Sequence, residues 1–332
     1  MKHNVKNIFS RNGILARSNG VFIATIVVLI IFSIMNRYFF TVTNIFGLLR
    51  VMSSLAIISL GQLLVIVSGE IDLSVGSIYG LVAMLMGILW ANGINLFLAL
   101  PIALLTGAVI GIINAWLVTK LFIPSFVVTL GMMNLLFGIT LMISKSSSIS
   151  PGYLFSLGEG HEMELSLFKG FGGYNIGGVL PMQIIWMIGI ALIIWFLYNK
   201  SIFGFRLRAI GGNTEAAKFM HLPVVKYKYL AFMICGLLAG LGGILDFSFV
   251  GTADPGGGST ITFSQFAAVI IGGASLSGGR GNILGTLVAA FLLTVLSNGL
   301  VLLNVGAFAQ LIFIGFITIG AVALDTKMGK GA

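Results

Sequence analysis

Three carboxylates, those of Glu70, Asp72 and Asp246, lie within or beside apolar stretches that are long enough to cross a membrane. An ionised side chain in hydrocarbon costs at least about 2.5 to 3.5 kcal/mol, so each of the three is a candidate functional group. All three histidines lie outside these stretches. The sequence therefore offers no row of acids and histidines that could relay protons, which argues against coupling to an ion gradient.

The segment that holds the first two carboxylates reads S-G-E-I-D-L-S-V-G-S, from Ser68 to Ser77, and separates two apolar runs. One interpretation is a simple helix break, in which the glycines unwind the backbone and Asp72 or Ser74 caps the next helix. The other is a discontinuous helix that lines a cavity, where water or substrate satisfies the unwound backbone. The two interpretations are compatible.

A basic loop, Leu207 to Pro223, is the second polar segment. Its glycines, Gly211 and Gly212, are expected to release the chain, and Asn213 is a favourable N-cap residue. The pattern predicts a helix of about two turns that begins near Thr214.

The composition of this short helix indicates what it contacts. Glu215 suits the first turn, and Pro223 prevents the helix from continuing far. Ala216, Ala217 and Met220 would share a small, flat apolar face at i, i+3 and i+4 spacing. Such a face fits a groove in a partner protein; the alternative is a solvated connector whose charges only set membrane orientation.

The third segment, Ile271 to Asn282, is rich in glycine but does not form a phosphate-binding loop. No G-x-x-x-x-G-K-[ST] motif occurs anywhere in the chain, so no nucleotide site is predicted. A tight turn with close helix packing explains the glycines better. The pairs Gly107/Gly111 and Gly236/Gly240 likewise predict close contacts between helices.

The composition excludes a soluble globular protein. Of the 332 residues 58% are hydrophobic and only 8% are charged, against about 25% charged in soluble domains. With Cys235 as the only cysteine, the chain can form neither an internal disulfide nor a cysteine-built metal site. We therefore expect an all-α integral membrane protein.

Ten apolar runs approach the length of about 20 residues that a helix needs to cross a bilayer. The second and third are almost continuous, and the eighth is short and bracketed by glycines. The runs are Val21–Phe40, Ile45–Ser68, Leu73–Ala91, Leu96–Thr119, Ile123–Ser144, Pro181–Tyr198, Tyr229–Val250, Ile261–Ser275, Asn282–Leu303 and Gly306–Leu324.

The basic residues test this count, because cytoplasmic loops carry an excess of lysine and arginine. In a ten-span chain with both termini cytoplasmic, 14 of the 18 basic residues fall on the cytoplasmic face. The formal net charge of +9 thus reflects membrane orientation and not nucleic-acid binding. Residues 1–20 form a cytoplasmic N-terminal segment before an uncleaved first helix, 145–180 a long external loop, and 199–228 the basic cytoplasmic loop.

Three motifs, in the order in which they follow along the chain, resemble those of the permease subunits of bacterial ABC importers for simple sugars of the ribose, galactose and xylose type. They are G-E-I-D-L-S-V-G-S at Gly69–Ser77, A-I-G-G-N-T-E-A-A at Ala209–Ala217, and the glycine-rich segment Ala268–Gly281. The first is one residue longer than the family's pattern. The resemblance covers nearly the whole chain, which is expected to form a single transmembrane permease domain over residues 1–332.

The resemblance implies a dimeric permease fed by an extracytoplasmic sugar-binding protein and driven by a separate ABC ATPase subunit. The second permease is another copy or a paralogue. ATP and Mg²⁺ would bind to the ATPase, so this chain would hold no cofactor, no metal and no catalytic residue. Coupling to the ATPase is implied for Gly211, Gly212, Asn213, Thr214, Glu215, Ala216, Ala217 and Met220. One departure from the family is His221-Leu222, where a glycine and a branched residue are usual, so the coupling helix could end differently.

Polar or aromatic residues in the predicted spans are candidates to line a substrate path. Each has an alternative role as a hydrogen-bonding contact between helices. The candidates are Gln62, Glu70, Asp72, Asn114, Trp116, Asn134, Asn298 and Gln310.

Other classes of membrane protein share this composition. An ion-coupled secondary transporter would work without an ATPase, and a passive channel would need neither ATPase nor gradient. A membrane-embedded enzyme is disfavoured because no span carries acidic and histidine residues at catalytic or metal-binding spacing. Co-purification of an ATPase with the native complex separates the first two from an ABC permease. The identity of the sugar stays open.

Overall fold

The structure is a computed structural model, and it describes residues 11–150, 162–306, 308–313, 315–316 and 318–320. Within this part of the chain, six helices are long and apolar enough to cross a membrane. They are α2 (Val42–Val67), α4 (Leu96–Lys120), α5 (Ser125–Ser144), α8 (Met182–Asn199), α11 (Val224–Val250) and α13 (Ile283–Leu302). Four shorter apolar helices accompany them: Gly20–Met35 within α1 (Arg11–Met35), α3 (Val75–Ala91), α12 (Ile261–Ile271) and Phe308–Gly320.

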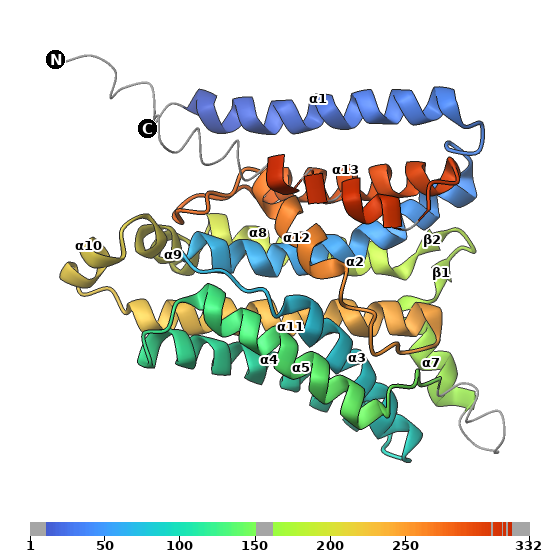
Figure 1. Ribbon diagram of the computed structural model, residues 1–332, viewed down its shortest axis with the longest axis horizontal. Helices are drawn as coiled ribbons and strands as arrows, with labels where there is room; N and C mark the ends of the chain where they lie inside the picture. The colour runs from blue at the N-terminus through green and yellow to red at the C-terminus, as the bar shows by residue number, and fades with distance from the viewer. Residues whose placement is uncertain (1–10, 151–161, 307, 314, 317, 321–332) are drawn as a thin grey trace.

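Helices α2 and α11 form the centre of the molecule, and most of the others lie beside them with similar axes (Figure 1). In the most apolar 18-residue stretch of each helix, 83% of α2 and 72% of α11 is buried, against 22% of α5 and of α8. The side chains that α5 and α8 leave exposed are themselves apolar, for example Phe126 and Leu192. An apolar exposed surface of this kind fits contact with lipid, as the composition predicted.

Glycines bring the central helices into close contact. A Cβ atom on Gly236 of α11 would lie 2.1 Å from the carbonyl oxygen of Gly107 of α4, and one on Gly111 would lie 2.2 Å from that of Phe232. Gly240 packs on Val82 of α3. The close helix contacts predicted from the two glycine pairs are thus confirmed.

Each predicted apolar run overlaps one of these helices, and the boundaries differ for local reasons. Helix α1 ends at Met35, and not at Phe40, because the Asn36 side chain accepts a hydrogen bond from the Tyr38 N–H at 2.8 Å and turns the chain. Helix α12 ends at Ile271, before Gly272, whose missing side chain lets the backbone of Thr286 approach. Helix α11 begins five residues earlier than predicted, directly after Pro223.

The two polar loops lie at opposite ends of the helices (Figure 1). One end carries α9 (Ile202–Gly212) and α10 (Thr214–Phe219). The other carries α7 (Glu162–Gly172) and two short antiparallel strands, β1 (Asn175–Ile176) and β2 (Leu180–Pro181), which pair Asn175 with Pro181. This separation agrees with the prediction that the two loops face opposite sides of the membrane. The first ten residues of the predicted N-terminal segment and the basic tail residues Lys327 and Lys330 lie outside the described residues.

Candidate functional site

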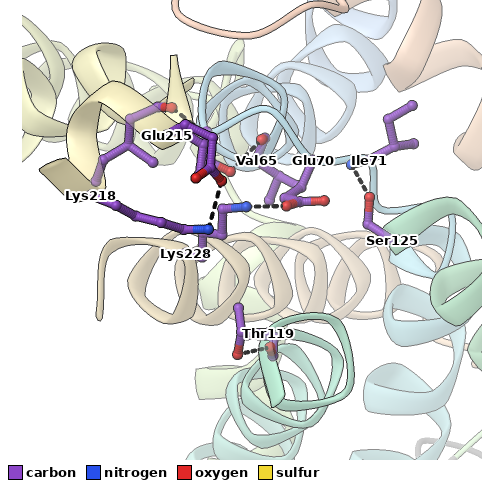
Figure 2. A network of polar contacts seen from close by, with 12 residues as sticks. Val65, Glu70, Ile71, Thr119, Ser125, Glu215, Lys218 and Lys228 are labelled. Carbon is purple, nitrogen blue, oxygen red and sulfur yellow. Dashed lines mark hydrogen bonds and ion pairs between the residues drawn. The ribbon is translucent and has the colours of Figure 1, made fainter. Parts of the chain in front are cut away.

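The segment between α2 and α3 is a true helix break. Gly69 follows the C-terminus of α2 with φ of +85°, a left-handed conformation that ends helices and favours glycine. Beyond it the unwound backbone is satisfied by α5: the Ile71 N–H donates to the Ser125 hydroxyl at 3.1 Å, and the Ile71 carbonyl accepts from the Thr129 hydroxyl at 3.3 Å (Figure 2 shows the first bond). The predicted break is confirmed.

Asp72 lies in this break, fully buried. Its Oδ1 accepts hydrogen bonds from the Ser74 N–H at 2.8 Å and the Ser74 hydroxyl at 2.6 Å. The Ser74 hydroxyl in turn accepts a bond from the Asn114 amide of α4 at 2.9 Å. Asp72 therefore orders Ser74, the N-cap residue of α3, and links it to α4. The Ser74 side chain itself makes no cap hydrogen bond, and Asp72 accepts only from Ser74, so the predicted side-chain cap on the first turn of α3 is not formed.

Three buried polar atoms around this break have no hydrogen-bond partner among the described residues: Asp72 Oδ2, Asn114 Oδ1 and Gln62 Nε2. The Oε1 of Gln62 accepts a weak bond from the Cys235 thiol of α11 at 3.7 Å. An unsatisfied buried polar group costs about 1 to 3 kcal/mol, so these atoms are suited to bind a water or a hydroxyl-bearing molecule. They form the polar interior of the bundle on the α10 side.

Glu70 lies apart from this interior. Its carboxylate forms an ion pair with the Lys228 ammonium, and both side chains are only slightly exposed (Figure 2). The pair ties the α2–α3 break to the first turns of α11. In the structure Glu70 thus links two elements near the basic loop that carries α9 and α10.

The other predicted path residues are dispersed. Trp116 is 47% exposed on the outer surface of α4, and Asn134 is also exposed and donates to a carbonyl of its own helix. Asn298 of α13 exchanges hydrogen bonds with Asn44 of α2, at 2.9 and 3.0 Å. Gln310 donates to a nearby backbone carbonyl, that of Val305. None of these four contacts the cluster around Asp72 through a hydrogen bond among the described residues.

A second buried polar cluster surrounds Asp246 of α11 in the half of the bundle farther from α10. Its carboxylate accepts hydrogen bonds from Ser54 of α2 at 2.5 Å, from Tyr79 of α3 at 2.8 Å and from Gln183 of α8 at 3.3 Å. Nearby, the Arg50 guanidinium donates to Asn175. The sequence identifies Asp246 as an intramembrane acid but does not identify its partners, because they come from three different helices.

The basic loop between α8 and α11 forms two helices in place of the expected one. Helix α9 continues through both Gly211 and Gly212, so the expectation that these glycines release the chain is wrong. Asn213 then separates α9 from α10, and its side chain accepts a hydrogen bond from the Ala216 N–H at 2.9 Å. The predicted N-cap and the helix beginning at Thr214 are confirmed, although α10 is only six residues long.

The predicted apolar face of this helix needs a correction. Ala217 is buried against the permease itself, whereas Phe219 and Met220 are 82% and 76% exposed. The face available to a partner therefore contains Met220 and Phe219, with Ala216 beside them and without Ala217. Ala217 is the buried residue of this six-residue helix, so its packing decides the orientation of α10.

The three sequence motifs meet behind this loop. A Cβ atom on Gly211 would lie 1.8 Å from the Val67 carbonyl oxygen, and one on Gly278 would lie 2.9 Å from the Cα of Gly69. The same Val67 carbonyl accepts a hydrogen bond from the Gly279 N–H at 2.9 Å. Residues from the end of α2, the end of α9 and the α12–α13 loop thus share one backbone contact, which we call the glycine junction: Val67, Gly69, Gly211, Gly278 and Gly279.

His221 marks the departure from the family pattern. Its φ is +56°, the left-handed region that glycine adopts at no cost. The turn after α10 therefore has the left-handed backbone that glycine favours, and here a histidine adopts it.

Sequence comparisons show which known proteins this chain is similar to. Residues 44–322 match the family model described as branched-chain amino acid transport system / permease component. The ribose import permease protein RbsC of Escherichia coli (strain K12) is 35% identical over 92% of this chain and 92% of its own length. No solved structure matches the chain significantly.

Further relatives carry related names. The D-allose transport system permease protein AlsC of E. coli (strain K12) is 34% identical over 93% of this chain and 91% of its own length. The xylose transport system permease protein XylH of Haemophilus influenzae is 30% identical over 93% of this chain and 96% of its own length. A multi-pass membrane architecture accompanies these matches. The chain therefore belongs to the family of permease subunits of ABC importers, which its three motifs resembled.

Proposed function

We propose that this permease moves a simple sugar or a sugar-like solute into the cytoplasm. The observation that carries the proposal is the identity of 30 to 35% with permeases named for ribose, allose and xylose, over more than nine-tenths of each chain. Sugars present many hydroxyl groups, and the unpartnered polar atoms of Asp72, Asn114 and Gln62 supply both acceptors and a donor for them. These three residues are our proposed contacts along the path.

The proposed assembly contains four kinds of component. The exposed face of α10, with Phe219 and Met220, docks on a separate ABC ATPase that binds ATP and Mg²⁺. An extracytoplasmic sugar-binding protein delivers the solute at the end that carries α7. A second permease, as a copy or a paralogue, completes the transmembrane unit. The chain itself acts as one permease domain without a cofactor of its own.

Uptake by the reconstituted complex tests this function. Liposomes that contain the permease, with its ATPase facing the lumen, are expected to take up sugar only when ATP is inside the liposomes and the loaded binding protein is outside. The measurement is accumulation of radiolabelled ribose, allose and xylose in parallel. Uphill uptake by the permease alone under an ion gradient would identify a secondary transporter, and equilibration without ATP or gradient would identify a channel.

The proposed topology has ten membrane crossings with both termini in the cytoplasm. The six long helices and four shorter apolar helices supply ten candidates. The third crossing combines the unwound segment 68–74 with α3, and the eighth contains the short helix α12. Unwound backbone at membrane depth is tolerated where protein side chains satisfy it, as α5 does at Ile71.

Cysteine labelling tests the orientation. In a Cys235→Ser background, Lys218→Cys on α10 is expected to react with an impermeant maleimide only after the cells are opened. Tyr174→Cys, exposed at the opposite end of the bundle, is expected to react in intact cells. Cys235 is buried, so its replacement removes the background without exposing a surface. The reverse labelling pattern would contradict the proposed topology.

A further inference from the structure

A groove of about 910 Å³ lies beside α10, where α4 ends and α11 begins. Its apolar wall includes Val118 of α4, Phe122 of the following turn, and Val225 and Tyr229 of α11. Phe122 is 85% exposed, although it is one of the largest apolar side chains of the region. The groove therefore presents an apolar surface without a covering element in the described part of the chain.

Lysines surround this apolar wall. Among its lining residues Glu70 is the only acid, so the groove is strongly basic. Two of the lysines lie in the first turns of α11, where the helix macrodipole is also positive and does not offset their charge. The lining lysines are Lys120, Lys218, Lys226 and Lys228.

The ion pairs of the loop leave two of these charges available. Lys228 is paired with Glu70, and Lys218 is paired at 2.7 Å with a glutamate of its own helix (Figure 2). Within the residues that the structure describes, Lys120 and Lys226 take part in no ion pair, and both are exposed. The groove thus combines two available cations with an apolar wall, which is the complement of an amphipathic anion.

The position of the groove restricts what can fill it. Val118 lies in the last turn of α4 and Tyr229 in the second turn of α11, two helices that are long and apolar enough to cross a membrane. In the proposed orientation the groove therefore lies at the cytoplasmic interface of the bilayer, where both acyl chains and head groups are within reach. A soluble subunit reaches the lysines but not the apolar wall, and a sugar has no apolar chain to place there. Basic pockets between helices on the cytoplasmic side are typical sites for anionic lipid head groups.

We propose that this groove binds an anionic phospholipid, with the phosphate between Lys120 and Lys226 and an acyl chain along Val118, Phe122 and Tyr229. Because Thr214 and Lys218 of α10 also line the groove, the lipid would support the base of the coupling helix. The site is distinct from the polar interior around Asp72 and from the exposed face of α10.

Native mass spectrometry of the purified full chain tests the proposal. The protein is equilibrated with mixed micelles that contain equal amounts of phosphatidylglycerol and phosphatidylcholine, and the lipids that stay bound are counted. We expect preferential binding of phosphatidylglycerol. In the variant Lys120→Gln/Lys226→Gln this binding should weaken about tenfold or more, since each lysine near an anionic lipid contributes about 1 kcal/mol.

Matched variants separate this site from general charge attraction. Lys200→Gln/Arg280→Gln removes two exposed positive charges from the same end of the chain and should bind phosphatidylglycerol like the wild type. Lys120→Arg/Lys226→Arg keeps the charge and should also retain the lipid. The proposal would be overturned if the wild type bound both lipids equally or if all three variants lost the lipid equally. Displacement of the lipid by inorganic phosphate or by the ATPase subunit would overturn it as well.

Discussion

Replacement of Gly211 by alanine is expected to destabilise the permease by about 1 to 3 kcal/mol and to abolish most of its ATP-driven uptake. The added Cβ would lie 1.8 Å from the Val67 carbonyl oxygen and 2.7 Å from the Gly279 N–H nitrogen. These two atoms are hydrogen-bonded to each other, so the methyl group would separate them. Both are backbone atoms, so the overlap can be relieved only by a backbone shift of α9, of α2 or of the α12–α13 loop.

The opposing effect is smaller. Gly211 lies within α9, where alanine is favoured over glycine by about 0.5 to 1 kcal/mol. A backbone overlap of this size exceeds that gain. The expected loss therefore reflects the glycine junction and not the helix propensity of the residue.

Gly212 supplies the matched control for this substitution. It is the next residue of the same helix, and a Cβ atom on it would meet nothing within 4 Å. Gly212→Ala is therefore expected to be neutral or slightly stabilising. Size-exclusion chromatography of detergent extracts after heating measures both variants, together with uptake by the reconstituted complex. Equal thermal stability of the two variants would show that the junction is not tightly packed.

Local chemistry made part of this site predictable from the sequence. An asparagine after two glycines and before an acidic first turn predicts an N-cap, and Asn213 forms that cap. Glycine and aspartate between apolar runs predict a break, and Gly69 and Asp72 form it. Each of these features depends on residues a few positions apart, whose chemistry is readable without knowledge of the fold.

Features that depend on packing could not be predicted in the same way. The side on which Ala217 is buried is decided by the elements behind α10, not by the six residues of the helix. The cluster at Asp246 needs partners from three other helices, and the pair of Lys228 with Glu70 joins residues 158 positions apart. The sequence predicts that Gly211 releases the chain, because a close backbone approach leaves no sign in the sequence beyond the glycine itself.

The double substitution Phe219→Glu/Met220→Glu is expected to lower ATP-driven uptake at least tenfold while the permease stays inserted and stable. Both side chains are more than three-quarters exposed in the lone chain, so their replacement removes little internal packing. In the proposed complex they would be covered by the ATPase, and burial of a large apolar side chain contributes about 1.5 to 3 kcal/mol. Burying two carboxylates in the interface would in addition weaken binding of the ATPase, because each charge loses its hydration.

The measurements separate docking from folding. Retention of the ATPase on the tagged permease reports docking, and the melting temperature of the permease alone reports folding. Asn199→Glu is the control, because it adds a carboxylate at an exposed position at the same end of the bundle but outside α10. Ala217→Trp is unsuitable for this purpose, since it would disturb buried packing. If the double variant keeps both the ATPase and full uptake, the exposed face of α10 is not the docking surface, and the coupling contact must lie elsewhere on this end of the chain.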